Sequence, residues 1–237
     1  MQWHELSMNK VSFIGLIGVA IILPAIPLVH YPFSWLETFF HEFSHCLMTL
    51  LTGGKVIAIE LRLNGSGASH LRGGVAFLIA LAGYFGTIVA GALIYLSAMR
   101  AHHSSAKRIV LMLTTIILVT VLVWGHNFVT YLIGAVLVAM FYLFLHFRVT
   151  RMVSLFVKFC GLFVMVNAIR SPLELVDGKD IGDGAKLATI TGIPEIFWVF
   201  LWVSVALLSL WQMWVYIKKK NKKEKKKSLL NTLFGED

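Results

Sequence analysis

Three ionisable residues in the segment HEFSH, namely His41, Glu42 and His45, have the types and the spacing of a catalytic metal site. Residues four apart on a helix lie on one face, one turn above the other, so His41 and His45 can bind a single metal ion. In zinc hydrolases with the pattern HExxH, the glutamate is the general base and zinc keeps one coordination position for water. The segment therefore predicts one Zn²⁺ per chain, with His41 and His45 as ligands and Glu42 as the catalytic base.

The segment around these residues, FFHEFSHCLMTLLTGGK (residues 39–55), is otherwise mostly apolar. An ionisable side chain at the centre of a membrane helix costs at least about 2.5 kcal/mol, so three of them need a reason. A metal site that faces the protein interior supplies that reason. Ionisable residues within spans also mark ion pathways, which leaves a transporter or a non-catalytic metal-binding membrane scaffold as the alternative. Transporters are expected to have paired broken helices in matching halves, and the sequence does not show them.

The composition is that of a polytopic membrane protein. Of the 237 residues, 58% are hydrophobic and 14% are charged, and the mean hydropathy is +0.79. A soluble domain carries about 25% charged residues, so a soluble enzyme is excluded. We expect an all-α membrane domain over residues 1–217 and a basic tail over residues 218–237. About seven transmembrane helices are predicted from the apolar runs Val11–Leu28, Phe33–Leu51, Val75–Ala98, Ile109–Trp124, Phe128–Phe147, Met152–Ile169 and Ile193–Ile217.

A small β-hairpin is predicted directly after the HExxH helix. In KVIAIELRL (residues 55–63), apolar side chains alternate with others, as expected for a strand with one apolar face. The following NGSG is a turn signal. In the first predicted span, Pro24 and Pro27 favour a kink or a break.

Positive charge suggests which side of the membrane each end occupies. The run KKKNKKEKKK (residues 218–227) follows the last span and predicts a cytoplasmic tail that contacts anionic lipid. The hairpin and the loop of residues 171–192 are then expected together on the opposite side. Most of the net charge of +9 comes from this tail, so nucleic acid is not an expected partner. The predicted localisation is the cell membrane, and the oligomeric state is left open.

Several segments together resemble the site-2 protease family of intramembrane zinc metallopeptidases. They are HEFSHCLMTLLTGGKVIAIEL, GSGASHLRGG, LAGYFG and SPLELVDGKDIGDGAKLATITGIP, and the resemblance extends from residue 33 to residue 205. It is greatest with the compact branch found in bacteria and plants, which lacks a PDZ domain. The resemblance implies regulated cleavage of membrane-protein substrates. It also implies that His41, His45 and a distant aspartate hold the zinc ion.

Two aspartates are candidates for the third ligand. Val176-Asp177-Gly178 resembles the Leu-Asp-Gly motif of the wider family. Gly182-Asp183-Gly184, followed by AKLATITGIP, resembles the Ser-Asp-Ala segment and the Thr-Gly-x-Pro ending of the compact branch. We favour Asp183 and keep Asp177 as the alternative. The sequence does not identify substrate-binding residues.

Overall fold

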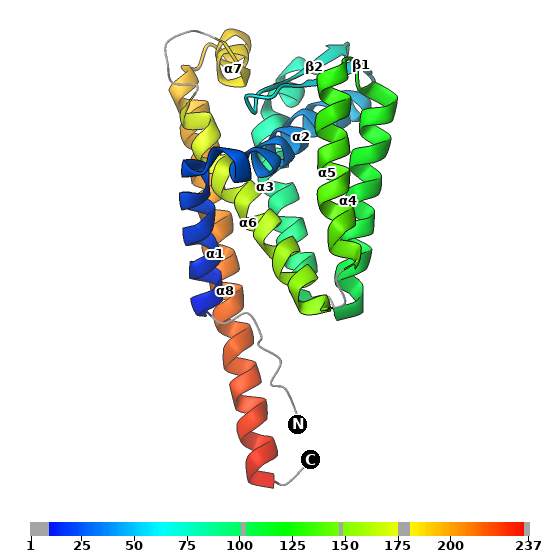
Figure 1. Ribbon diagram of the computed structural model, residues 1–237. Helices are drawn as coiled ribbons and strands as arrows, with labels where there is room; N and C mark the ends of the chain where they lie inside the picture. Colours follow the sequence, from blue (N-terminus) through cyan, green and yellow to red (C-terminus); the bar gives the residue numbers. More distant parts are fainter. Residues whose placement is uncertain (1–9, 101–102, 147–148, 175–180, 235–237) are drawn as a thin grey trace.

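The computed structural model describes residues 10–100, 103–146, 149–174 and 181–234 (Figure 1). These ranges form α-helices and one two-stranded antiparallel sheet, as predicted. In chain order the elements are α1 (Lys10–Ile22), the 3₁₀-helix η1 (Leu23–Ala25), α2 (Pro27–Leu51), β1 (Lys55–Leu61), β2 (Gly67–Arg72), α3 (Ala76–Arg100), α4 (His103–Trp124), α5 (Phe128–His146), α6 (Thr150–Leu173), α7 (Asp183–Thr191) and α8 (Glu195–Phe234).

The number of helices that could cross a membrane is smaller than the seven predicted. Within the described ranges, α3, α4, α5, α6 and α8 are each long and apolar enough to cross a membrane. The first two predicted spans qualify only together, as a pair bent by 108°. Pro24 lies in η1 and Pro27 begins α2, and proline cannot donate the backbone hydrogen bond that would continue a helix. The predicted break is thus confirmed, and the count becomes five spans, or six with the bent pair.

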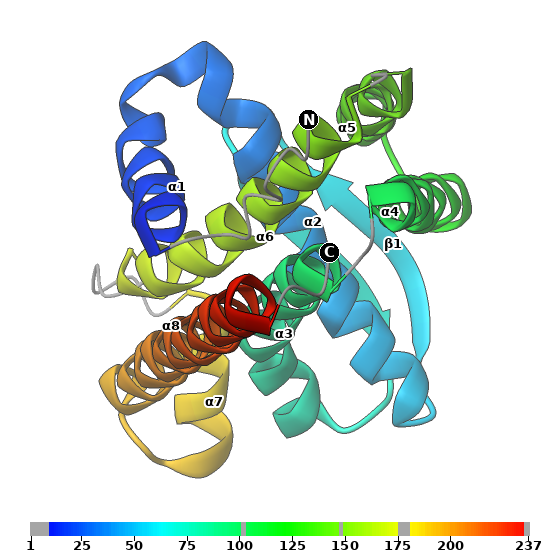
Figure 2. The same ribbon diagram turned by 90° about the horizontal axis from the view of Figure 1, so that it is seen from below.

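Helix α6 crosses the middle of the bundle, as the view along the helices shows (Figure 2). It packs most closely on α3, where Gly91 and Gly161 bring the two backbones together. A Cβ atom on Gly161 would lie 2.8 Å from the carbonyl oxygen of Gly91. Small residues permit this close approach of helices in membranes. The close packing holds α3 and α6 in a fixed position relative to each other, and both helices border the cavity described below.

The turn of the hairpin is bonded to α2, and the outer edge of β1 is bonded to Gly125. The indole Nε1 of Trp35 donates to the carbonyl of Leu63 (3.2 Å), and the hydroxyl of Thr38 donates to that of Gly65 (2.5 Å). At the outer edge of β1, Ile59 forms a bridge with Gly125. No such partner of β2 is found on its outer edge within the described residues, so this edge stays available for pairing.

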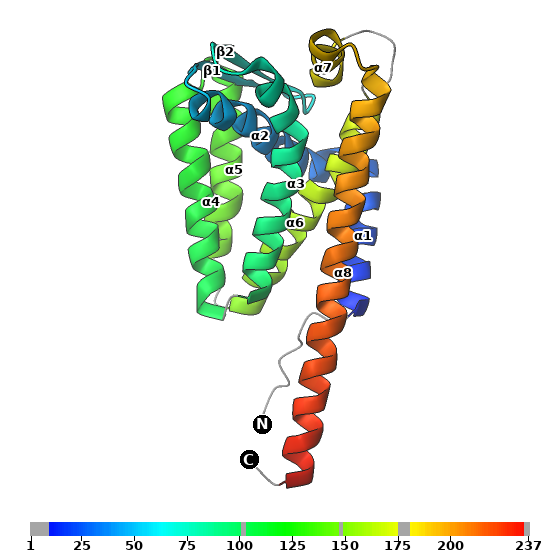
Figure 3. The same ribbon diagram turned by 180° about the vertical axis from the view of Figure 1, so that it is seen from behind.

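The hairpin and α7 lie at the same end of the bundle, as predicted, and α8 extends beyond the opposite end (Figures 1 and 3). The basic run is part of α8, which continues as a helix to Phe234. Helix α8 has no break at residue 217. The division of the chain into a membrane domain and a tail of residues 218–237 therefore remains a prediction.

Candidate metal centre

Three side chains from distant parts of the chain bring one donor atom each to a common point. His41 Nε2 lies 3.0 Å from His45 Nε2 and 3.0 Å from Asp183 Oδ2, and His45 Nε2 lies 2.9 Å from the same oxygen. The two histidines share one face of α2, as their spacing predicts. Asp183 is the first residue of α7, 142 positions after His41. These three residues are the group that could hold a metal ion among the described parts of the chain.

Helix α7 turns Asp183 back toward α2. Gly182 has φ of 117°, a conformation that L-residues other than glycine rarely adopt, and it starts the helix at the aspartate. A Cβ atom on Gly184 would lie 2.6 Å from Oε1 of Glu195, so this glycine lets α7 approach α8. Leu187 is fully buried against Trp198 and Trp202 of α8. The packing of α7 against both α3 and α8 therefore determines where the third donor lies.

The first turn of α3 orients His45. Its Nδ1 lies 2.7 Å from the carbonyl oxygen of Ile79. A carbonyl can only accept, so Nδ1 carries the proton and Nε2 keeps its lone pair for a metal ion. Gly83 lies on the same helix, directly against both imidazoles, since a Cβ atom there would lie 2.5 Å from His45 Nε2 and 2.6 Å from His41 Cε1. The ring of Tyr84 packs edge-on against His41 with 4.5 Å between ring centroids.

Asp183 is held in its ionised form. Its side chain is buried, which by itself favours the neutral acid, but the adjacent imidazoles of His41 and His45 outweigh burial and hold the pKa of the carboxyl well below its usual range. Its other oxygen, Oδ1, accepts from Lys186 Nζ at 3.4 Å. The two oxygens thus have different partners, and Oδ2 is the one directed at the histidines.

The donor set fits zinc. Two imidazole nitrogens and one carboxylate oxygen are ligands that zinc accepts, and three protein ligands leave a fourth position open, as in catalytic sites. At metal–ligand distances of about 2.0–2.1 Å, tetrahedral ligands lie about 3.3 Å apart. The observed separations of 2.9–3.0 Å are a few tenths of an ångström shorter. Small outward shifts of these side chains would fit them to the ion.

Glu42 lies beside this cluster and does not take part in it. Its side chain is buried, and within the described residues its carboxylate makes no hydrogen bond or ion pair. On β2, Gly67 passes directly over it, because a Cβ atom there would lie 2.9 Å from Glu42 Oε1. The carboxylate is therefore free to accept a proton next to the outer edge of β2.

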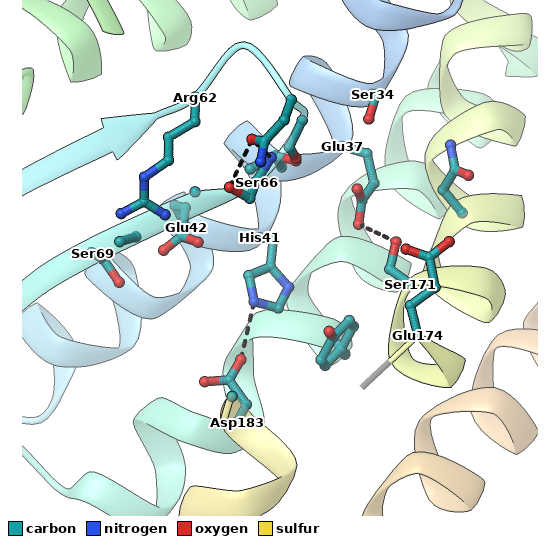
Figure 4. Close-up of a pocket in the computed structure, with 18 of the residues that line it drawn as sticks. Ser34, Glu37, His41, Glu42, Arg62, Ser66, Ser69, Ser171, Glu174 and Asp183 are labelled. Carbon is teal, nitrogen blue, oxygen red and sulfur yellow. Dashed lines mark hydrogen bonds and ion pairs between the residues drawn. The ribbon is translucent and has the colours of Figure 1, made fainter. Parts of the chain in front are cut away.

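These groups line a cavity of about 740 Å³ between α2, the hairpin, α6 and α7 (Figure 4). One face of α2 contributes a polar stripe to it, made of His30, Ser34, Glu37, Thr38, His41, Glu42 and His45. Figure 4 shows His41 between two groups, with Glu42 and Arg62 on the hairpin side and Glu37 with Ser171 on the α6 side. The cavity is large enough for several residues of an extended peptide.

Each predicted site residue can now be placed. His41, His45 and Asp183 come together, and Glu42 adjoins them; their roles as ligands and base stay predictions. Asp177, the alternative ligand, lies outside the described residues. Sequence reasoning missed Glu37, which lies one turn before His41 on the same face of α2 and is buried in the cavity wall. Helical spacing from His41 would have found it.

Comparisons with known proteins give one match. A family model described as Peptidase M50B-like matches residues 14–213. Comparisons with curated proteins and with solved structures gave no match. Together with the apolar helices, this family indicates a multi-pass membrane protein.

Proposed function

The chain belongs to the Peptidase M50B-like family, as its resemblance to the site-2 proteases predicted, and we propose that it is an intramembrane zinc endopeptidase. Its reaction is the hydrolysis of peptide bonds in membrane-protein substrates, as in regulated intramembrane proteolysis. The observation that carries this proposal is the convergence of His41 Nε2, His45 Nε2 and Asp183 Oδ2 beside the unpaired carboxylate of Glu42.

His41, His45 and Asp183 would hold the zinc ion, and Glu42 would move the protons. Zinc at this position supplies Lewis acidity that polarises a scissile carbonyl and acidifies a water molecule. Glu42 would take one proton from a water molecule, whose oxygen adds to the scissile carbonyl carbon, and would deliver that proton to the nitrogen of the leaving amine as the C–N bond breaks. The ionised Asp183 would offset part of the positive charge of the ion, and Ile79 keeps His45 in the tautomer that binding requires.

The outer edge of β2 supplies a surface for the substrate. A helical substrate hides its amides in internal hydrogen bonds, so it has to unwind before cleavage. An extended peptide can add to a sheet edge through main-chain hydrogen bonds. The edge of β1 is bridged to Gly125, whereas Gly67, Ala68 and Ser69 of β2 line the cavity. A peptide paired with β2 would pass over Glu42.

The position of the chain in the cell membrane is part of the same proposal. The lysines near the end of α8 support a cytoplasmic location for this end, with contacts to anionic lipid headgroups. The hairpin, α7 and the candidate metal centre would then lie toward the opposite face of the membrane, since they occupy the other end of the bundle (Figure 1).

The test separates metal binding from catalysis. The purified full chain is reconstituted in lipid vesicles with single-span peptides, and zinc is measured by elemental analysis. We expect about one zinc per chain and peptide cleavage in the wild type. Glu42→Gln should retain zinc and lose at least about a hundredfold in cleavage rate, whereas the double variant His41→Ala/His45→Ala should lose both. Zinc without cleavage in the wild type would favour the non-catalytic metal-binding scaffold.

A further inference from the structure

Glu37 is a buried carboxylate in the cavity that the proposed reaction does not use. It lies on α2, is 7% exposed and lines the cavity. Its one hydrogen bond within the described residues comes from Ser171 Oγ of α6, at 3.4 Å (Figure 4). A carboxylate offers about four acceptor positions, and burial without partners is costly. Glu37 therefore has unused acceptor capacity in a place where water is restricted.

The cations near Glu37 do not neutralise it. Arg170 of α6 also lines the cavity, but its Nε is bonded to Glu174 Oε1 at 3.0 Å. No ion pair of Glu37 is found among the residues that the structure describes. Arg62 of the hairpin and Lys186 of α7 also line the cavity, but they contact Glu60 and Asp183 instead. Within the described residues, the open acceptor positions of Glu37 can thus take a cation or a strong hydrogen-bond donor from a bound peptide.

The distance between Glu37 and His41 indicates which residue of a bound peptide, counted from the cleaved bond, would carry the donor that pairs with Glu37. Glu37 precedes His41 by four residues, about 6 Å along the helix axis. An extended peptide advances about 3.3 Å per residue, so this distance corresponds to about two residues. Figure 4 shows Glu37 on the α6 side of His41, away from Glu42 and Arg62. A peptide that crosses the metal centre would reach Glu37 on the side of the cleaved bond nearer α6.

The geometry points to a specificity subsite in which Glu37, hydrogen-bonded by Ser171, binds a lysine or arginine side chain of the substrate about two residues from the cleaved bond. This inference rests on the proposed function and names its substrate class as membrane segments with a basic residue next to the unwound cleavage region. The ammonium or guanidinium group would fill the acceptor positions of Glu37 that the fold leaves open, and Ser171 would fix the orientation of the carboxylate.

Binding to a full-length Glu42→Gln chain tests the subsite without requiring cleavage. The probes are fluorescent single-span peptides of Leu and Ala with a central Gly-Ser break, carrying Lys or the uncharged Met at each position within three residues of the break. With Glu37 intact and zinc loaded, we expect Lys to improve the dissociation constant at least about tenfold over Met at one position, as for one charge-assisted hydrogen bond. In the double variant with Glu37→Gln, the ratio should fall below about threefold.

Glu174→Gln is the matched control, because it removes a carboxylate from the wall of the same cavity that already pairs with Arg170. It should keep the preference for Lys. The subsite is overturned if no position prefers Lys, if the preference survives Glu37→Gln, if Glu174→Gln abolishes it equally, or if no peptide binds. Absence of cleavage by the wild-type chain would reject the proposed function instead, and the ratio of dissociation constants would still decide the subsite.

Discussion

Replacing Gly83 with alanine should weaken zinc binding although Gly83 is not a ligand. The added Cβ would lie 2.5 Å from His45 Nε2 and 2.6 Å from His41 Cε1. Non-bonded carbon atoms prefer separations of about 3.5–4.0 Å, so the imidazoles or the helix would have to shift by about 1 Å. Metal sites tolerate deviations of only about 0.2 Å in ligand distance. The shift is thus about five times larger than the site accepts.

The expected loss follows from this displacement. Overpacking in a tight interior costs about 1–3 kcal/mol, and each 1.4 kcal/mol is a factor of about ten in a binding constant. We therefore expect Gly83→Ala to weaken zinc affinity between about 10-fold and 100-fold, the range found when groups that support metal ligands are changed. Competition with a chromophoric chelator on the purified full chain would measure it, with peptide cleavage as a second measurement.

Gly86→Ala is the control for a general effect on helix packing. It introduces the same methyl group on the same helix, where it would overlap the Oγ and Cβ atoms of Ser44 and not the histidine rings. We expect it to lower the thermal stability of the chain more than Gly83→Ala does, while zinc affinity changes less than about threefold, since the methyl group does not press on the imidazole rings. Equal zinc affinity in Gly83→Ala and the wild type would refute the argument from Cβ distances, as would equal losses in both variants.

Two further predictions concern the base and the third ligand. Gly67→Ala should slow peptide cleavage at least about tenfold and leave zinc content unchanged, because the new Cβ would lie 2.8 Å from Glu42 Cγ and 2.7 Å from Thr38 Cγ2, away from the histidines. Cleavage rates and elemental analysis of the variant would check this, and a loss of zinc would contradict it. Asp183→Ala should lower zinc occupancy and abolish cleavage, and Asp177→Ala should be milder; the reverse order in the same two measurements would make Asp177 the ligand.

The sequence predicted the parts of the site that depend on local geometry. His41 and His45 are one helical turn apart, so any helix through this segment brings their side chains to one face. The alternation in residues 55–63 likewise predicted the strand β1. Asp183 was different, because its place depends on the packing of α7 against α3 and α8 through Leu187, which no local pattern reveals. It entered as a candidate only through the resemblance to a known family.

The span count was predicted less well than the close approach of His41, His45 and Asp183, and the polar residues of α2 explain why. Helix α2 carries the polar stripe from His30 to His45, which makes the metal site recognisable in the sequence. The stripe also lowers the hydropathy of α2, so this helix meets the criteria for a span only together with α1. Because ionisable groups are costly against lipid, the stripe has to be covered by protein, and the hairpin, α6 and α7 all line the cavity over it. A helix with a polar, cavity-lining face is therefore the span that hydropathy alone assigns least well.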